Sequence, residues 1–164
     1  AWLTNAPGYC VCVPTADCVP VLLYDKKQHV VAAVHAGWKG TVKHIVSHVM
    51  DNMTQKFGTQ GEDVIACIGP SISLESFEVG DKMYDAFKES GFDMSLISMK
   101  KKETGKYHID LWEANRIELL NLGVPAEQIE VAGICTYIHH DEFFSARSLG
   151  IVSGRTLSGI MIRK

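Results

Sequence analysis

The stretch TADCVPVLLYDKKQHVVAAVHAGWKG, residues 15–40, decides how this chain folds. It holds two apolar runs, VPVLLY at 19–24 and VVAAV at 30–34, separated by the polar turn DKKQH. Short apolar runs without apolar–polar alternation predict β-strands that are covered on both faces. Cys18 stands just before the first run and His35 just after the second, so a thiol and an imidazole are expected at strand ends.

Outward from this stretch, strands alternate with helices. Further strands are expected at 9–13, 64–68, 129–137 and 157–162, and helices at 41–57, 81–90 and 111–123. The first helix follows the i, i+3, i+4, i+7 spacing of apolar residues, with Thr41 as its expected cap and Gly58 as its end. The sequence therefore predicts a mixed α/β fold, with layered sheets flanked by helices, in a single domain over residues 1–164.

Composition and charge exclude several classes of partner. The net charge is -3, and no basic run is longer than Lys100–Lys102, which argues against a nucleic-acid-binding face. No apolar run approaches the roughly 18 residues of a membrane span, and no leader peptide is visible. The opening residues Ala1–Thr4 resemble the middle of a domain, so the chain is expected to be incomplete at its N-terminus.

Cysteine usage indicates a reducing compartment. The chain has five cysteines, without a CxxC pair or a compact disulfide spacing. Cys10, Cys12 and Cys67 lie inside apolar runs, where a free thiol is expected to behave as a small hydrophobic side chain. We therefore expect a cytoplasmic protein with free thiols.

Cys18 and His35 are the main candidates for chemistry. Each has a purely structural interpretation, as a packed thiol or a hydrogen-bonded histidine. Together, sulfur and imidazole nitrogen are the ligands that zinc or copper prefers, and also the nucleophile–base pair of a cysteine enzyme. The small residues Ala36 and Gly37 would allow close backbone approach to a ligand. A catalytic zinc normally needs three protein ligands, so a third donor has to be found.

Other polar residues leave two interpretations open. His44 and His48 have the spacing of a helical metal pair, but Ile45 stands where a zinc protease would have Glu, which favours a solvated helix face. The His139–Asp141 segment either contacts substrate or is an ordinary loop. Asp110 is either a helix cap or a catalytic carboxylate.

The long polar loop over 138–154 carries two adjacent aromatic residues and an arginine. Phe143 and Phe144 could stack on a flat ligand, and Arg147 could bind phosphate or carboxylate. Alternatively, one Phe anchors the loop in the core and the arginine forms a surface ion pair. Gly154 and Arg155 follow at the end of the loop.

Seven blocks follow one another over nearly the whole chain: TADCVPVLLYD, AAVHAGWKGT, IGPSISLESFEVG, DLWEANRIELL, CTY, FFSARSLG and SGR. In this order they resemble the bacterial YfiH/YlmD-type family of laccase-domain or polyphenol-oxidase proteins. Members of that family are also described as purine nucleoside phosphorylases with adenosine deaminase activity. The resemblance implies a YfiH-like fold and a zinc site built from His, Cys and His. Cys18 and His35 match its cysteine and its second histidine, whereas the first histidine belongs to a segment upstream of this chain.

The implied reaction is attack of phosphate on the sugar carbon of a purine nucleoside, giving free base and sugar 1-phosphate. The expected partners are therefore a purine nucleoside and phosphate, with Arg147 for the phosphate and Phe143 or Phe144 for the base. Hydrolytic deamination of adenosine suits a zinc-activated water, although the usual H-x-E and P-C-x-x-C signature is absent. In the family Cys often follows the IGP motif, where this chain has Ser71.

Three other functions are compatible with the sequence. The first is a copper-dependent polyphenol oxidase, disfavoured because the chain has no HxH motif for a multicopper centre. The second is a hydrolase with Cys18 as nucleophile and His35 as base, for example one that edits cell-wall precursors. The third is a regulatory domain that merely stores zinc. The sequence leaves the preferred nucleoside and the oligomeric state open.

Overall fold

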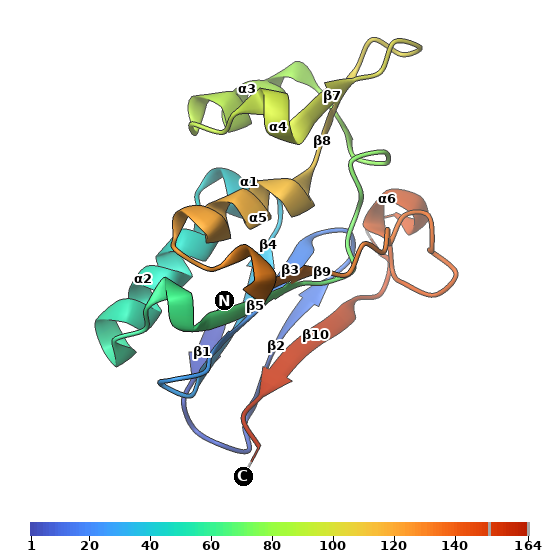
Figure 1. Cartoon of the computed structure of the whole chain (residues 1–164). Helices are drawn as coiled ribbons and strands as arrows, with labels where there is room; N and C mark the ends of the chain where they lie inside the picture. Colours follow the sequence, from blue (N-terminus) through green and yellow to red (C-terminus); the bar gives the residue numbers. More distant parts are fainter. Residues whose placement is uncertain (151, 164) are drawn as a thin grey trace.

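The computed structural model describes residues 1–150 and 152–163, and a five-stranded sheet lies at its centre (Figure 1). Its strand order is β1-β4-β3-β5-β9, and only the pair β5–β9 is parallel. The strands are β1 (Trp2–Thr4), β4 (Val30–Ala36), β3 (Val19–Asp25), β5 (Val64–Ile68) and β9 (Ile129–Val131). The predicted mixed α/β class is confirmed, although β1 was not predicted and β9 is much shorter than the strand expected at 129–137.

The two strands of the opening stretch pair with each other in the middle of this sheet. Val19 is opposite Ala36 and Pro20 is opposite His35 in their antiparallel register. Val21 and Leu23 are fully buried, as are Val30, Ala32 and Val34 on β4, so the prediction of covered strands is confirmed. β4 runs two residues further than predicted, which places His35 inside the strand.

Helices cover one face of the sheet: α1 (Trp38–Val42), α2 (Ile45–Phe57) and α5 (Leu111–Asn121). The prediction of one helix over 41–57 is wrong at its start, because His44 has a left-handed backbone (φ 53°) that separates α1 from α2. Thr41 lies within α1 and donates its hydroxyl to the carbonyl of Gly37 at 3.2 Å. Gly58 ends α2 with φ 76°, as predicted.

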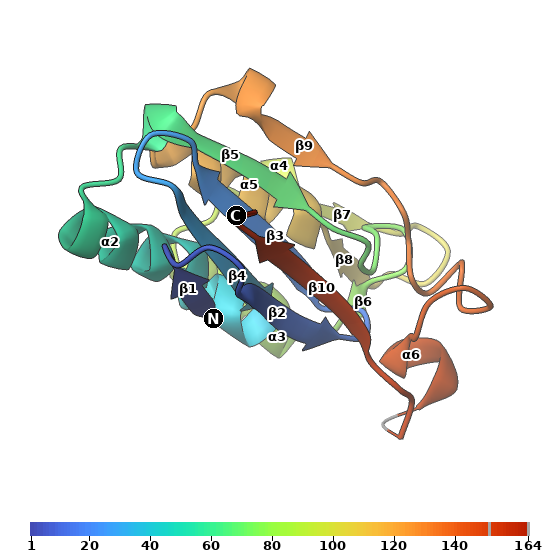
Figure 2. The same ribbon diagram turned by 90° about the horizontal axis from the view of Figure 1, so that it is seen from below.

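A two-stranded antiparallel sheet lies across the opposite face, formed by β2 (Cys10–Thr15) and β10 (Thr156–Met161) (Figure 2). Val13 points inward and is buried. Cys10 and Cys67 are exposed and Cys12 is only partly buried. The expectation that these three thiols are buried hydrophobic side chains is therefore wrong, because each occupies the outward position of the strand alternation.

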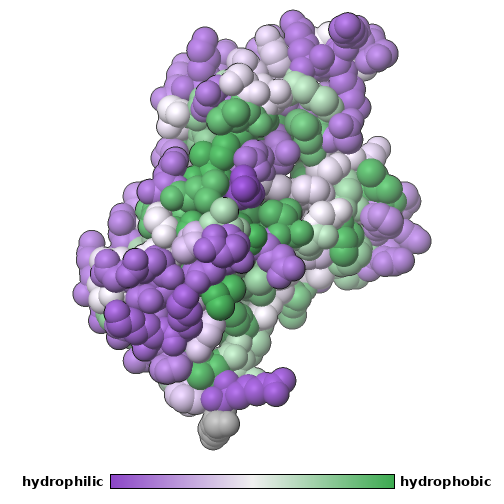
Figure 3. All heavy atoms as spheres, in the orientation of Figure 1, coloured by the Kyte–Doolittle hydropathy of each residue, from purple (hydrophilic) through white to green (hydrophobic). Residues whose placement is uncertain are grey.

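A smaller three-stranded sheet packs beyond α5, in the order β6-β8-β7. It consists of β6 (Glu78–Val79), β8 (Tyr107–Ile109) and β7 (Ser98–Lys100), and it is accompanied by α3 (Asp81–Glu89) and α4 (Met94–Ile97). The sequence predicted α3, but not these strands or α4. The turn between β7 and β8 and the outer side of α2 are hydrophilic, whereas apolar residues gather between them (Figure 3).

The segment after β9 is mostly irregular and wraps past the ends of the strands (Figure 1). The expected loop over 138–154 contains α6 (Ala146–Leu149), which begins after Ser145, and its residue 151 lies outside the described residues. Two short 3-10 helices, η1 (Gly61–Asp63) and η2 (Ala126–Gln128), precede β5 and β9. Within the described part of the chain, no helix is both long and apolar enough to traverse a bilayer.

Candidate functional site

Cys18 and His35 approach each other around Gly37. Cys18 directly precedes β3, His35 is the penultimate residue of β4, and Gly37 is the N-cap of α1. A Cβ atom placed on Gly37 would lie 2.8 Å from the Cys18 sulfur and 3.6 Å from His35 Nε2, so the sulfur and Nε2 are at most about 6.4 Å apart. The adjacent pairing of β3 and β4 thus brings the two predicted side chains to one place.

The absence of a side chain at Gly37 makes room for the Cys18 sulfur. Its backbone angles, φ -69° and ψ 167°, suit any residue, so the turn itself does not require glycine. A contact of 2.8 Å between a Cβ and the Cys18 sulfur is, however, shorter than a van der Waals contact allows. Gly37 therefore accommodates the Cys18 sulfur, and close approach of a ligand to its backbone stays a prediction.

The electrostatic surroundings favour the neutral form of both side chains. Burial raises the pKa of the Cys18 thiol, the charge of Asp17 raises it further, and Arg155 opposes both effects. Burial lowers the pKa of His35 and the charge of Arg155 lowers it further, whereas a backbone hydrogen bond with Pro14 opposes this. Arg155 thus acts on both groups, a role that the sequence did not reveal.

Asp17 connects the Cys18 turn to the distant 136–147 segment. It has a left-handed backbone, with φ 76°. Its Oδ1 accepts a hydrogen bond from Thr136 Oγ1 at 2.8 Å, and its Oδ2 accepts one from the backbone N–H of Arg147 at 2.7 Å. Its carbonyl accepts a third from the N–H of Ile72. Sequence reasoning missed this role, because the two bonded segments are more than a hundred residues away in the chain.

The three predicted substrate-contacting residues lie in different surroundings. Phe144 is 45% exposed, and a Cβ on Gly154 would lie 2.6 Å from its ring, so the ring packs against the residue before Arg155. Phe143 is partly buried. The Arg147 guanidinium lies 5.5 Å above the Phe77 ring and donates to the carbonyl of Glu78 at 3.2 Å. Its head group therefore faces the small sheet.

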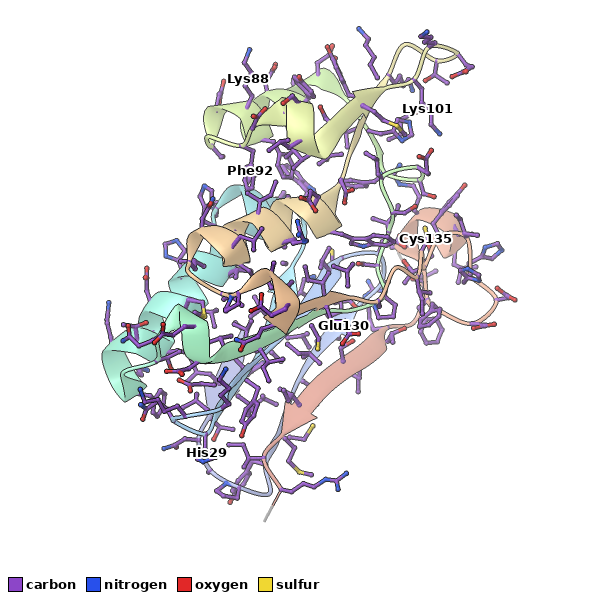
Figure 4. The ribbon with its side chains drawn as sticks, viewed as in Figure 1. His29, Lys88, Phe92, Lys101, Glu130 and Cys135 are labelled. Carbon is purple, nitrogen blue, oxygen red and sulfur yellow. The ribbon has the colours of Figure 1, made fainter. Side chains whose placement is uncertain are left out.

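A polar cavity of about 300 Å³ adjoins Arg147, lined by Glu75, Ser76, Glu78, His108, Tyr137 and Arg147. Cys135 lies next to it, near α6 (Figure 4). Burial raises the pKa of the Cys135 thiol, but hydrogen bonds with Ser73 and Ser76 outweigh burial and lower it overall. A larger cavity, of about 520 Å³ between the end of β10 and the central sheet, contains none of the predicted site residues.

The remaining candidates have structural surroundings. His44 stacks on Phe92 with ring centroids 5.1 Å apart, and its Nε2 is 3.0 Å from the carbonyl of Ser90, so it does not form a metal pair with the exposed His48. Asp110 accepts the N–H of Glu113 and caps α5. His139 and His140 are exposed in the turn after Cys135.

The Cys18 sulfur and the His35 imidazole nitrogen beside Gly37 are types of ligand that zinc binds. The sulfur comes from the residue before β3 and the imidazole nitrogen from β4, the strand that pairs with it. Within residues 1–150 and 152–163, no three His, Cys, Asp or Glu side chains are close enough together to hold a metal ion. The described residues therefore supply two ligands of a site that requires more.

Several known proteins are similar to this chain over almost its whole length. A purine nucleoside phosphorylase from Bacteroides thetaiotaomicron is 66% identical over 164 residues, which are 100% of this chain and 61% of that protein. "Adenosine deaminase RL5", from an unknown prokaryotic organism, is 45% identical over 98% of this chain and 61% of its own length. The crystal structure of the Bacillus licheniformis hypothetical protein YfiH superposes with a TM-score of 0.91 at 33% identity, covering 98% of this chain and 60% of that one.

The chain thus spans about three fifths of the length of these relatives. The family described as "multi-copper polyphenol oxidoreductase laccase" matches residues 1–163. This match covers almost the entire chain, and the resemblance noted from the sequence blocks is confirmed. The protein belongs to the multi-copper polyphenol oxidoreductase laccase family, which includes relatives named YfiH and YlmD.

Proposed function

We propose that this chain is the matching part of a purine nucleoside phosphorylase that also deaminates adenosine, with its reactive centre at Cys18 and His35. The observation that carries the proposal is the approach of the two side chains to one place beside Gly37. Relatives named purine nucleoside phosphorylase and adenosine deaminase support it. The substrates would be a purine nucleoside and inorganic phosphate.

Zinc is the proposed metal, with Cys18 and His35 as two of its ligands. A third ligand would come from outside these 164 residues, since the relatives are longer than the chain. When bound, zinc would supply a Lewis acid toward an oxygen of the substrate or of water. Copper is the weaker candidate, because a multicopper centre uses many histidines and this site offers one.

Arg147 and Arg155 are the proposed anion contacts. Arg155 lowers the pKa of both Cys18 and His35, so its positive charge acts at the centre itself. Arg147 belongs to the segment that Asp17 fixes, and its guanidinium carries five N–H donors, of which the bond to the Glu78 carbonyl uses one. Phe144, which is exposed next to Gly154, and Phe143 are the proposed contacts for the flat base.

The assay that tests the proposal uses the full-length protein with inosine and phosphate. Release of hypoxanthine should depend on phosphate, and Cys18→Ala should abolish it together with the bound zinc. Cys67→Ala is the matched control, because Cys67 is an exposed free thiol elsewhere on the sheet. A Cys18→Ala protein with full turnover and no metal would refute the proposal.

The cysteine hydrolase remains as an alternative, but the pKa shifts do not favour it. A thiolate–imidazolium pair needs a lowered thiol pKa and a raised imidazole pKa, and both shifts here have the opposite sign. A chelator that leaves turnover unchanged, combined with an alkylating agent that abolishes it, would establish the hydrolase instead.

A cytoplasmic location is also part of the proposal. All five cysteines are free thiols, including two whose sulfurs are only 3.5 Å apart. Such a pair is expected to stay reduced in a reducing compartment.

A further inference from the structure

A second cluster of sulfur atoms lies on the outer face of the β2–β10 sheet. Cys10 and Cys12 are two residues apart on β2, so their side chains point to the same side, and their sulfurs are 3.5 Å apart. Cys10 is exposed and Cys12 is partly exposed. Both thiols are therefore accessible in the described part of the molecule.

Gly159, on β10, lies directly opposite Cys12 and makes room for both sulfurs. A Cβ atom at this position would lie 2.7 Å from the Cys12 sulfur and 3.0 Å from the Cys10 sulfur. The two thiols thus converge over a strand position that has no side chain.

A third sulfur is available on the same face. Met161 is opposite Cys10 in the β2–β10 register, and directly opposed residues of an antiparallel pair present their side chains on one face. Its side chain is 46% exposed. Thiolates and thioethers together form the soft ligand set that selects Cu(I).

The sulfur separation distinguishes between coordination geometries. With metal–sulfur distances of about 2.3 Å, a linear two-sulfur site needs sulfurs about 4.6 Å apart, whereas a three-sulfur site needs about 4.0 Å and a tetrahedral one about 3.8 Å. The observed 3.5 Å is closer to the last two. A cation held here therefore requires a further ligand, which the position of Met161 offers.

We propose that Cys10, Cys12 and Met161 form a binding site for a soft monovalent cation of the Cu(I) class, separate from the Cys18–His35 centre. Binding releases the two thiol protons to solvent, and the cation is held by two thiolates and the thioether. The pKa of the Cys12 thiol is raised, first by its hydrogen bond with Cys10 and also by the charge of Cys10, and a cation between the sulfurs removes that repulsion.

The test is an anaerobic titration of the full-length protein with Cu(I) against a chromophoric Cu(I) chelator. Cys12→Ser should weaken binding at least tenfold, and Met161→Leu should weaken it severalfold while both thiols remain. Gly159→Ala should also weaken binding, although it removes no donor atom. Cys67→Ser and Cys18→Ser should retain the site, the first as an exposed-thiol control and the second to separate it from the other centre.

Circular dichroism of each variant would establish that the fold is retained. Unchanged Cu(I) affinity in Cys12→Ser would overturn the proposal. Loss of the bound Cu(I) in Cys18→Ser would overturn it as well, because the ion would then belong to the Cys18–His35 centre. An unchanged affinity in Met161→Leu would also overturn it, because the proposed site includes the thioether.

Discussion

The carboxylate of Asp17 accepts a hydrogen bond from Thr136 Oγ1 at 2.8 Å and thereby joins the residue before Cys18 to the segment that carries the proposed substrate contacts. Its other oxygen accepts the N–H of Arg147. The carboxylate therefore ties both distant positions to the residue before Cys18, alongside the backbone bond from the Thr136 N–H to the Ser71 carbonyl.

Substitution of Asp17 should separate its two roles. Asp17→Ala loses both hydrogen bonds and places alanine in a left-handed conformation, so the free energy of unfolding should fall by roughly 2–4 kcal/mol. Asp17→Asn keeps one acceptor oxygen and tolerates this conformation, so its loss should be about 1 kcal/mol. Asp17→Gly relieves the backbone strain and should fall between the two. Equal urea midpoints for the Ala and Asn variants would contradict this account.

Gly37→Ala should disable the site without removing a ligand. The added methyl group would lie 2.8 Å from the Cys18 sulfur and so displace the thiol from its position beside His35. Gly80→Ala is a close control, because Gly80 also caps a helix with a similar backbone (φ -85°, ψ 167°) and a Cβ there meets nothing within 4 Å. Metal content and turnover should fall only in Gly37→Ala, and equal losses in both variants would point to a helix effect.

Glu118 stabilises the start of α2 from a neighbouring helix. Its Oε1 accepts the backbone N–H of Ser47 at 2.9 Å and the Ser47 hydroxyl at 2.6 Å, while the N-cap residue His44 makes no side-chain cap. Glu118→Ala should therefore lower the free energy of unfolding by about 2 kcal/mol. Glu113→Ala, which removes a partly exposed ion pair on the same helix, should cost about 0.5 kcal/mol. Thermal or urea unfolding would measure the difference.

The pH dependence of Cys18 alkylation should report its surroundings. Because burial and Asp17 raise the pKa of this thiol, the rate with iodoacetamide in metal-free protein should rise only at a pH above the ordinary thiol value. Arg155→Gln removes a charge that lowers this pKa, so the inflection should move to higher pH. Asp17→Asn should move it to lower pH. Peptide mass spectrometry follows the modified residue, and an inflection below the ordinary value would contradict the assignment.

The sequence predicted the parts of this fold that depend on local pattern. Continuous apolar runs predicted the strands at 19–24 and 30–34, and capping residues predicted the end of α2 at Gly58 and the start of α5 at Asp110. The nearness of Cys18 to His35 follows from the pairing of these two strands. The break between α1 and α2 could not be predicted in this way, because His44 adopts its left-handed backbone while contacting Phe92 and Ser90 from a distant segment.

The site was predicted less completely than the fold. Asp17 looked like a turn residue, and its partners Thr136 and Arg147 become visible only after the chain has folded. Arg155 affects Cys18 and His35 through space, which no spacing in the sequence reveals. Cys10 and Cys12 were misassigned because an apolar run on a two-stranded sheet still has an outward face.

The central claim is that the sulfur of Cys18 and the imidazole of His35 bind one metal ion, and metal analysis of the full-length protein tests it most directly. The account predicts about one equivalent of zinc in the wild-type and Cys67→Ser proteins, and its loss in both Cys18→Ser and His35→Ala. Retention of the full zinc content by either of these last two variants would contradict it.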